Sequence, residues 1–352
     1  MISSVNSWRQ GSPDFDEFPD EPKWFTLQFL DVPDIIDFSL CSARARDAVR
    51  ALKHREMRIA AQVAERGVIQ ISSGEKDGSK PLFEWTINKA PFEGGLPSKY
   101  LNGVKLETEK PRDGIRFTSR APYIEEAMIG VITYFSDLFQ THIHTFMGKL
   151  EDQATFSRLL TALGKCEKVT ITIGQDRDVI FRQALESLSV SEVLEVTGGP
   201  KPSFKIDKVF RTKQLLFKDA RWVTRANFLN MQCDTIVLHR CLLTVADFKV
   251  FLERWASGTN KSFYFLFVVL EDSDMNLEPL VLDKRARYGG IKVAPWDRRK
   301  RGRFYNTLDL GDGLDIERPD GRLGTFGALR NNFFFVTWKN RFPKKIKNGG
   351  AY

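Results

Sequence analysis

The sequence lacks the features that mark secreted and membrane-spanning proteins. It has only four cysteines among 352 residues, and no two of them form a Cys-x-x-Cys pair. No apolar run reaches the roughly 18 residues of a membrane-spanning helix. The first residues also lack the charged and apolar segments of a signal peptide. These absences predict a protein of a reducing compartment, cytoplasmic or nuclear or both, with no membrane partner.

Motifs of catalysis and cofactor binding are also missing. The glycine pairs lack the strand-turn-helix context of a phosphate-binding loop, and no Gly-x-Ser-x-Gly stretch occurs. Of the four histidines, His142 and His144 alternate on a predicted strand, and His239 lies two residues before Cys241. That last pair has a single residue between its members and suits a structural metal poorly, because paired zinc ligands usually have about two to five residues between them. We therefore expect no catalytic residues, no metal and no cofactor.

What the chain does have is a large apolar content and an excess of positive charge. Hydrophobic residues make up 42% of it, with 28 phenylalanines, which is enough for a sizeable core and for two domains. The formal net charge is +8, which permits an anionic partner without requiring one. Basic residues are concentrated late in the chain, at 298–303 and 344–347.

The basic run at 298–303 is flanked by Trp296, Phe304 and Tyr305. Cationic and aromatic side chains together can hold single-stranded nucleic acid through phosphate contacts and stacking. A solvated loop or a docking site for an acidic protein explains the run equally well. Nucleic acid is therefore the second choice of partner.

Hydrophobic patterning predicts an α+β chain. The expected parts are a disordered acidic arm at 1–22, short helices at 23–66, antiparallel strands and a linking helix at 67–140, a repeat-like region at 141–275, C-terminal strands at 276–342 and a basic tail at 343–352. The alternating runs at 68–71, 82–87, 104–107 and 115–118 predict the antiparallel strands. The segment 53–66, charged and rich in alanine, is expected to continue as helix.

From residue 142, strand-like and helical runs alternate. The strand-like runs are 143–147, 169–173, 193–197, 214–217, 235–238 and 263–270, and the helical ones are 156–163, 179–188, 226–231 and 245–255. The strand-like runs begin about 20 to 29 residues apart, which predicts a leucine-rich-repeat-like strand–helix solenoid. The alternative is an alternating α/β domain without a true repeat. Further on, Asp320-Gly321 predicts a hairpin turn, and 333–338 a last strand.

The stretch 30–51 reads as two short helices, the first with apolar residues on more than one face and the second, over 43–52, with one apolar stripe beside charged residues. Asp31 is placed to cap the first helix, and Pro33 falls in its first turn, where a missing N–H costs nothing. Helices this short cannot bury their own apolar surface. Either the rest of the chain or a partner must cover them, and pattern alone favours an ordinary core helix.

The run from Leu30 to Arg46 resembles the second half of an F-box, in the form found in nematode F-box proteins. The resemblance implies docking on the Skp-type adaptor of a cullin ubiquitin ligase. The implied contact residues are Leu30, Val32, Pro33, Ile35, Ile36, Phe38 and Leu40. One departure is that the segment 24–29 runs almost directly into Leu30, so most of the first F-box helix is missing. Losing three apolar anchors at ~1.5–3 kcal/mol each would weaken docking by several orders of magnitude.

A second resemblance covers 204–270, which is similar to the nematode F-box-associated domain of type 2. The matching residues are Cys233, Leu243, Thr244, Asp247, Phe251, Leu252, Trp255, Gly258 and Asn260. Within this set Thr244 caps a helix whose apolar stripe includes Phe251 and Trp255, and Gly258 ends it. The resemblance implies mostly structural roles for these residues and no catalytic ones.

Together the two resemblances imply a non-enzymatic, substrate-recognition adaptor of a cullin-type (SCF) ubiquitin ligase. The helices at 30–51 would bind the Skp-type adaptor, and through it a cullin, while the later domain binds a protein substrate. Two alternatives stay open. One is a basic nucleic-acid-binding protein, and the other is a degenerate family member that acts only as a protein-binding module.

Overall fold

A computed structural model describes residues 27, 29–52, 57–74, 81–109, 115–150, 152–258, 263–272, 277–283, 285–295 and 313–338. The chain forms two compact units, each described here by itself. The first comprises the described residues up to Phe146 and Thr161–Gly164, and the second comprises Met147–Leu160 and the described residues from Lys165 on. The boundary therefore falls within β7 (Ile143–Leu150) and α5 (Gln153–Leu163). No helix in the described part of the chain is long and apolar enough to cross a membrane.

The first unit is built on a mixed sheet with the strand order β7-β1-β2-β3-β6-β5-β4. Its further strands are β1 (Met57–Val63), β2 (Arg66–Ser73), β3 (Phe83–Lys89), β4 (Ser98–Leu101), β5 (Val104–Glu109) and β6 (Arg116–Ala121). Alternate residues along these strands are buried, and α4 (Ile124–Leu138) packs on the strands. Trp85, Phe117 and Phe135 form an aromatic cluster with ring centroids 5.4 to 6.0 Å apart.

Two expectations for this unit are wrong. The segment predicted to continue as helix forms the strand β1, in which Ile59, Ala61 and Val63 alternate inward and pair with β2. Sheet pairing outweighs the helix preference of its alanines there. The strands are also not all antiparallel, because β3 and β6 pair in parallel, while the β4–β5 hairpin lies between them in sequence and pairs on the far side of β6.

The stretch 30–51 forms two helices, as expected. Helix α2 spans Val32–Ser39 with Asp31 at its N-cap and Pro33 in its first turn, although the Asp31 side chain makes no capping hydrogen bond. Helix α3 spans Ala43–Ala51, and the Ser42 hydroxyl accepts a 3.0 Å hydrogen bond from the Ala45 N–H at its start. The two helices pack on each other and α3 packs on α4, so this hairpin belongs to the first unit.

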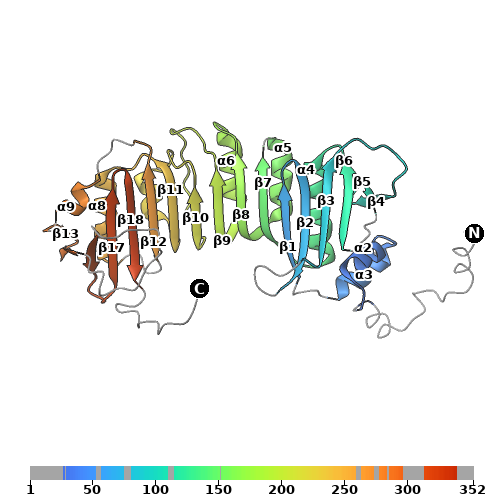
Figure 1. The fold of residues 1–352 in the computed structure, drawn as a ribbon, viewed down its shortest axis with the longest axis horizontal. Coiled ribbons are helices and arrows are strands. Elements are labelled where there is room, and N and C mark those ends of the chain that lie inside the picture. The colour runs from blue at the N-terminus through green and yellow to red at the C-terminus, as the bar shows by residue number, and fades with distance from the viewer. Residues whose placement is uncertain are drawn as a thin grey trace, which may run out of the picture. The chain divides into compact units, whose positions relative to one another are not determined.

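The second unit is built on parallel strands that follow one another both in sequence and in space (Figure 1). They are β8 (Lys165–Ile173), β9 (Ser189–Thr197), β10 (Gln214–Phe217), β11 (Thr235–Cys241) and β12 (Phe265–Leu270). The connections contain α6 (Asp178–Ser187), α7 (Arg225–Asn230) and α8 (Val245–Ala256). These strands and helices lie where the sequence predicts them.

The sheet of the second unit ends in antiparallel strands. Strand β12 pairs with β18 (Asn332–Trp338), and the order continues through β17 (Leu323–Leu329), β16 (Leu314–Glu317) and β15 (Ala294–Pro295). The hairpin predicted at Asp320-Gly321 joins β16 and β17. The small elements α9 (Pro279–Leu282), β13 (Arg287–Tyr288) and β14 (Ile291–Lys292) precede them. The fold is therefore α+β with a mixed sheet.

Candidate functional site

One face of the parallel strands of the second unit is packed with helix side chains. Phe181 of α6 contacts Phe217 of β10 at 6.5 Å, and Phe248 of α8 stacks on Phe333 of β18 at 4.3 Å between ring centroids. Residues on this side of the strands, such as Leu238 and Val268, are buried. In Figure 1 the helices α6 and α8 lie on this face and leave the opposite one uncovered by them.

We define the open face as the side of β8–β12 opposite α6 and α8. Register places Thr170, Glu195, Leu216, Val237 and Phe267 in one row across five neighbouring strands. All five are half-buried, whereas their sequence neighbours are buried under the helices. Because neighbouring strands lie ~4.8 Å apart, the row forms a continuous strip of side chains.

The side chains of the open face change from polar on β8 to aromatic on β12. A second row runs from Lys168 through Val193, Gln214 and Thr235 to Phe265. Apolar side chains thus gather toward β12. These half-buried apolar residues are Val193, Leu216, Val237, Phe265, Phe267 and Val269. The imidazole of His239 meets the Phe267 ring edge-on, with centroids 6.3 Å apart.

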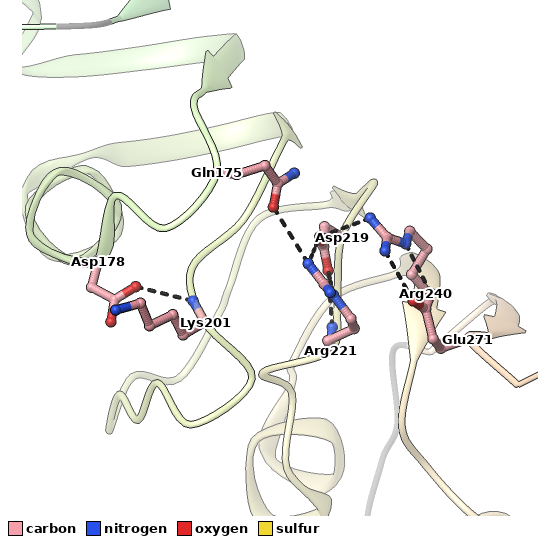
Figure 2. A network of polar contacts seen from close by, with 7 residues as sticks. All are labelled: Gln175, Asp178, Lys201, Asp219, Arg221, Arg240 and Glu271. Atoms are coloured by element: carbon pink, nitrogen blue, oxygen red, sulfur yellow. Dashed lines mark hydrogen bonds and ion pairs between the residues drawn. The ribbon is translucent and has the colours of Figure 1, made fainter.

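A network of charged residues lies at the carboxyl ends of these strands (Figure 2). Asp219, which is 2% exposed, accepts two hydrogen bonds from the Arg221 guanidinium, at 2.9 and 2.7 Å. Arg240 donates to Asp219 at 3.2 Å and makes a two-pronged contact with Glu271, at 2.8 and 2.9 Å. Gln175 accepts a weaker contact from Arg221 at 3.4 Å. The network therefore joins the loops that follow β8, β10 and β12 to the end of β11.

The backbone at this edge of the sheet has positive φ angles and an irregular register. Arg240 has φ +56°, and the β11–β12 register shifts between Leu238 and Cys241. Gly198, after β9, has φ +82°, and an added Cβ would lie 1.9 Å from the Ile173 carbonyl oxygen. Side chains are disfavoured at positive φ, so Arg240 is held there by its surroundings. The contacts of its side chain with Asp219 and Glu271 help to stabilise this backbone conformation.

Burial and pairing set the charge states here. Burial raises the pKa of Asp219, but hydrogen bonds from Arg221 and the positive charges of Arg221 and Arg240 outweigh it and leave the pKa below its ordinary value. Hydrogen bonds from Arg240 likewise lower the pKa of Glu271. Burial, aided by the charge of Lys218, lowers the pKa of His239. At neutral pH both carboxyl groups are thus ionised and His239 is neutral.

Ion pairs lie at the two ends of the open face. At the amino ends of the strands Lys213 pairs with Glu192 at 2.6 Å, and near the carboxyl ends Lys218 lies 3.8 Å from Glu195. At the carboxyl ends the network contributes two more carboxylates and two guanidiniums, which pair with each other. The face therefore combines an apolar centre with a rim of paired charges.

The residues of the second resemblance build the interior of the unit. Cys233, Leu243, Leu252 and Trp255 are buried, and Phe251 is 8% exposed. The Asp247 carboxylate accepts 2.8 and 2.9 Å hydrogen bonds from the backbone N–H and hydroxyl of Thr244, and it also pairs with Arg225. Gly258 ends α8 with φ +87°. Asn260 lies outside the described residues.

The residues expected to contact an adaptor are gathered on α2 and just before it. Val32, Pro33, Ile35 and Ile36 are buried within the first unit. The remaining three are half-buried, namely Leu30, Phe38 and Leu40. The structure thus brings these residues together but covers four of them with the protein's own chain.

The residues noted for possible metal or nucleic-acid chemistry lie in different settings. His142 and His144 stack with centroids 4.4 Å apart, and the His144 Nδ1 accepts a 3.2 Å hydrogen bond from the Ile59 N–H. Burial raises the pKa of Cys233 and Cys241 to about 12, so both thiols stay protonated at neutral pH. The basic run at 298–303 lies outside the described residues.

Sequence reasoning did not single out the charged network. Its members are separated by up to 96 positions between Gln175 and Glu271, and each pairs with a residue from another strand end. A usable signal was that polar residues follow the predicted strands directly, as Asp219 does after the run 214–217. Parallel strands place such residues along one edge of a sheet.

The chain is similar along most of its length to two proteins of Caenorhabditis elegans. It is 25% identical to "Uncharacterized protein F59B2.9", with 94% of this chain and 80% of that protein covered. It is 23% identical to "Uncharacterized protein F59B2.8", with 94% and 78% covered. No protein-family model matches the chain, and no solved structure does either.

Proposed function

We propose that the protein is a non-catalytic recognition protein that binds a protein partner on the open face of the second unit. The observation that carries the proposal is the arrangement of Leu216, Val237 and Phe267 in a half-buried strip between two rims of paired charges. Protein interfaces have this anatomy, with an apolar and often aromatic centre surrounded by polar groups.

The strand array is proposed to be a leucine-rich-repeat-like solenoid. In its support, β8–β12 are parallel, adjacent in chain order and begin at residues 165, 189, 214, 235 and 265. Stacked units of this kind present an extended surface on one face, and such surfaces serve binding.

The charge balance of the rim favours a protein over nucleic acid. Affinity for nucleic acid comes largely from unpaired lysine and arginine side chains that contact phosphates. At the described rim, Lys213, Arg221 and Arg240 are each paired with a carboxylate. A protein partner with its own apolar surface matches such a face better than a phosphate backbone does.

The test places a charge on the open face. Val237→Glu puts a carboxylate in the centre of the strip, and Val179→Glu, at a 59% exposed position of α6, is the matched control. A partner recovered with the wild-type protein should bind the control normally. It should bind Val237→Glu at least about 30-fold more weakly, as expected for a central interface position. Equal binding by both variants, each with wild-type circular dichroism, would refute the proposal.

A second function is docking of the α2–α3 hairpin on a Skp-type adaptor, which would make the protein a ubiquitin-ligase subunit. It is favoured by the half-buried state of Leu30, Phe38 and Leu40 beside the buried α2 residues. The direct test is recovery of the protein on a purified, immobilised Skp-type adaptor, with Phe38→Asp as the disabling variant. No recovery of the wild-type protein, or equal recovery of Phe38→Asp, counts against this function.

A further inference from the structure

The apolar side of α2 is covered within the first unit. Ile35 is 3% exposed, and Ile36 and Val49 are fully buried. In this conformation the residues implied in adaptor contact cannot all reach a partner at once. Docking on another protein through these side chains therefore requires the α2–α3 hairpin to leave its place.

Besides its buried apolar side chains, the hairpin has polar contacts with the rest of the unit. The Tyr134 hydroxyl of α4 lies 2.7 Å from the Ser39 hydroxyl of α2. Since Ser39 donates its proton to the Ile36 carbonyl oxygen at 2.6 Å, Tyr134 is the donor in this pair. The phenol is 2% exposed, so this hydrogen bond is shielded from water.

Charged groups add three further contacts. The guanidinium of Arg50 in α3 lies 3.1 Å from the Asp137 carboxylate of α4. Lys99 of β4 pairs with Asp37 of α2. The Arg46 guanidinium of α3 lies 5.3 Å from the centroid of the Tyr134 ring. Tyr134 thus contacts both helices of the hairpin.

We infer that the α2–α3 hairpin is a detachable latch that hides its own docking face, and that Tyr134 holds it shut. This inference rests on the second proposed function for the identity of the partner, but the latch itself can be measured without one. Helices of 8 and 9 residues are unstable alone. When the hairpin opens, its two helices therefore unfold or separate from the unit, while α4 stays packed on its sheet.

The test is hydrogen–deuterium exchange of the full chain, comparing the α2–α3 amides with those of α4 and β2. Tyr134→Phe removes one buried hydrogen bond and leaves the ring in place. We expect the hairpin amides to exchange about fivefold faster, the effect of one ordinary hydrogen bond, with α4 and β2 unchanged. The double variant with Arg50→Gln should exchange faster still.

Thr133→Val is the matched control. Its hydroxyl donates a 2.8 Å hydrogen bond to the Ile129 carbonyl oxygen within α4. It neighbours Tyr134 on the same helix, and its variant should leave exchange of the hairpin at the wild-type rate. If Tyr134→Phe speeds exchange of β2 as much as that of the hairpin, the hairpin unfolds only with the whole unit and the latch is refuted. No acceleration at all refutes it too.

A binding measurement distinguishes the latch from the adaptor role. Opening raises the fraction of molecules competent to bind, so Tyr134→Phe should bind a purified Skp-type adaptor about fivefold more tightly than wild type. Faster hairpin exchange with no adaptor binding in either protein would leave the latch standing and overturn the adaptor role. Binding of equal strength in both, despite faster exchange, would overturn the claim that the latch hides the docking face.

Discussion

Among single residues, Gly258 lies at a point where a side chain would meet a buried guanidinium. It ends α8 at φ +87°, and a Cβ there would lie 2.8 Å from an Nη2 atom of Arg318. Arg318 is 5% exposed, lies 5.4 Å from the Trp255 ring centroid and pairs with Asp320 at 2.8 Å. The glycine thus allows the helix to end where this guanidinium passes over the tryptophan.

Replacing Gly258 should therefore cost more than backbone strain alone. We expect Gly258→Ala to lower the free energy of unfolding by about 2–3 kcal/mol, measured by urea denaturation. The control is Gly290→Ala, at φ +81°, where no atom of the described residues beyond its chain neighbours lies within 4 Å of the added Cβ, and which should cost about 1 kcal/mol. Equal losses in the two variants would show that the approach of Arg318 is unimportant.

The pH dependence of stability should report on Asp219. Its pKa is lower in the folded protein than in the unfolded chain, so its stabilisation is fully present above the unfolded value of about 3.9. The stabilisation is lost as the pH falls through the folded pKa. Asp219→Asn should thus lower the free energy of unfolding by about 1–3 kcal/mol at pH 7.

That difference between Asp219→Asn and wild type should shrink below about pH 4. The exposed Asp176, in the loop after β8, provides the control, and Asp176→Asn should have a free energy of unfolding at pH 7 close to that of wild type. A deficit for Asp219→Asn that keeps its size at low pH would mean that charge pairing is not its cause.

At the scale of elements, α8 shows how local chemistry fixes a helix start. Its N-cap Thr244 and the third helical residue Asp247 form a capping box, and Asp247 is 6% exposed. Thr244→Ala should lower the free energy of unfolding by about 1 kcal/mol, since the Thr244 hydroxyl bond to the carboxylate is lost. Ser257→Ala, at the exposed C-cap, should change it little. Both free energies of unfolding are measured by urea denaturation. A larger loss for Ser257→Ala than for Thr244→Ala would contradict the role of the capping box.

The same scale shows what sequence can predict. The strands and helices from residue 143 to 270 follow from alternation and from caps such as Thr244, because each signal lies within one element. Helix was wrongly expected at Ala60 and Ala61, since only pairing with β2 makes that segment a strand. The parallel pairing of β3 with β6 was also missed, because it depends on where the β4–β5 hairpin is placed.

The candidate site was less predictable than the elements. Which strand residues face away from the helices follows from alternation, so Leu216 and Val237 could have been placed on one face. The pairing of Asp219 with Arg240 could not, because it depends on the parallel order of β10 and β11. Likewise the apolar pattern of α2 cannot say whether a partner or the protein's own chain covers Ile36.

For the whole molecule, we propose separate tasks for the two units. We propose that the second unit binds a protein partner on its open face. In the first unit, we propose that Tyr134 holds the helical hairpin in place. Each task is tested within its own unit, so one can fail without the other.

Footprinting with hydroxyl radicals can show whether a protein partner covers the open face. Side chains are oxidised in the protein alone and in its complex with a recovered partner, and modification is read by mass spectrometry. We expect Phe265, Phe267 and His239 to lose reactivity severalfold in the complex, while the exposed Val179 of α6 keeps its reactivity. Protection of Val179 with no change at Phe265 and Phe267 would contradict it.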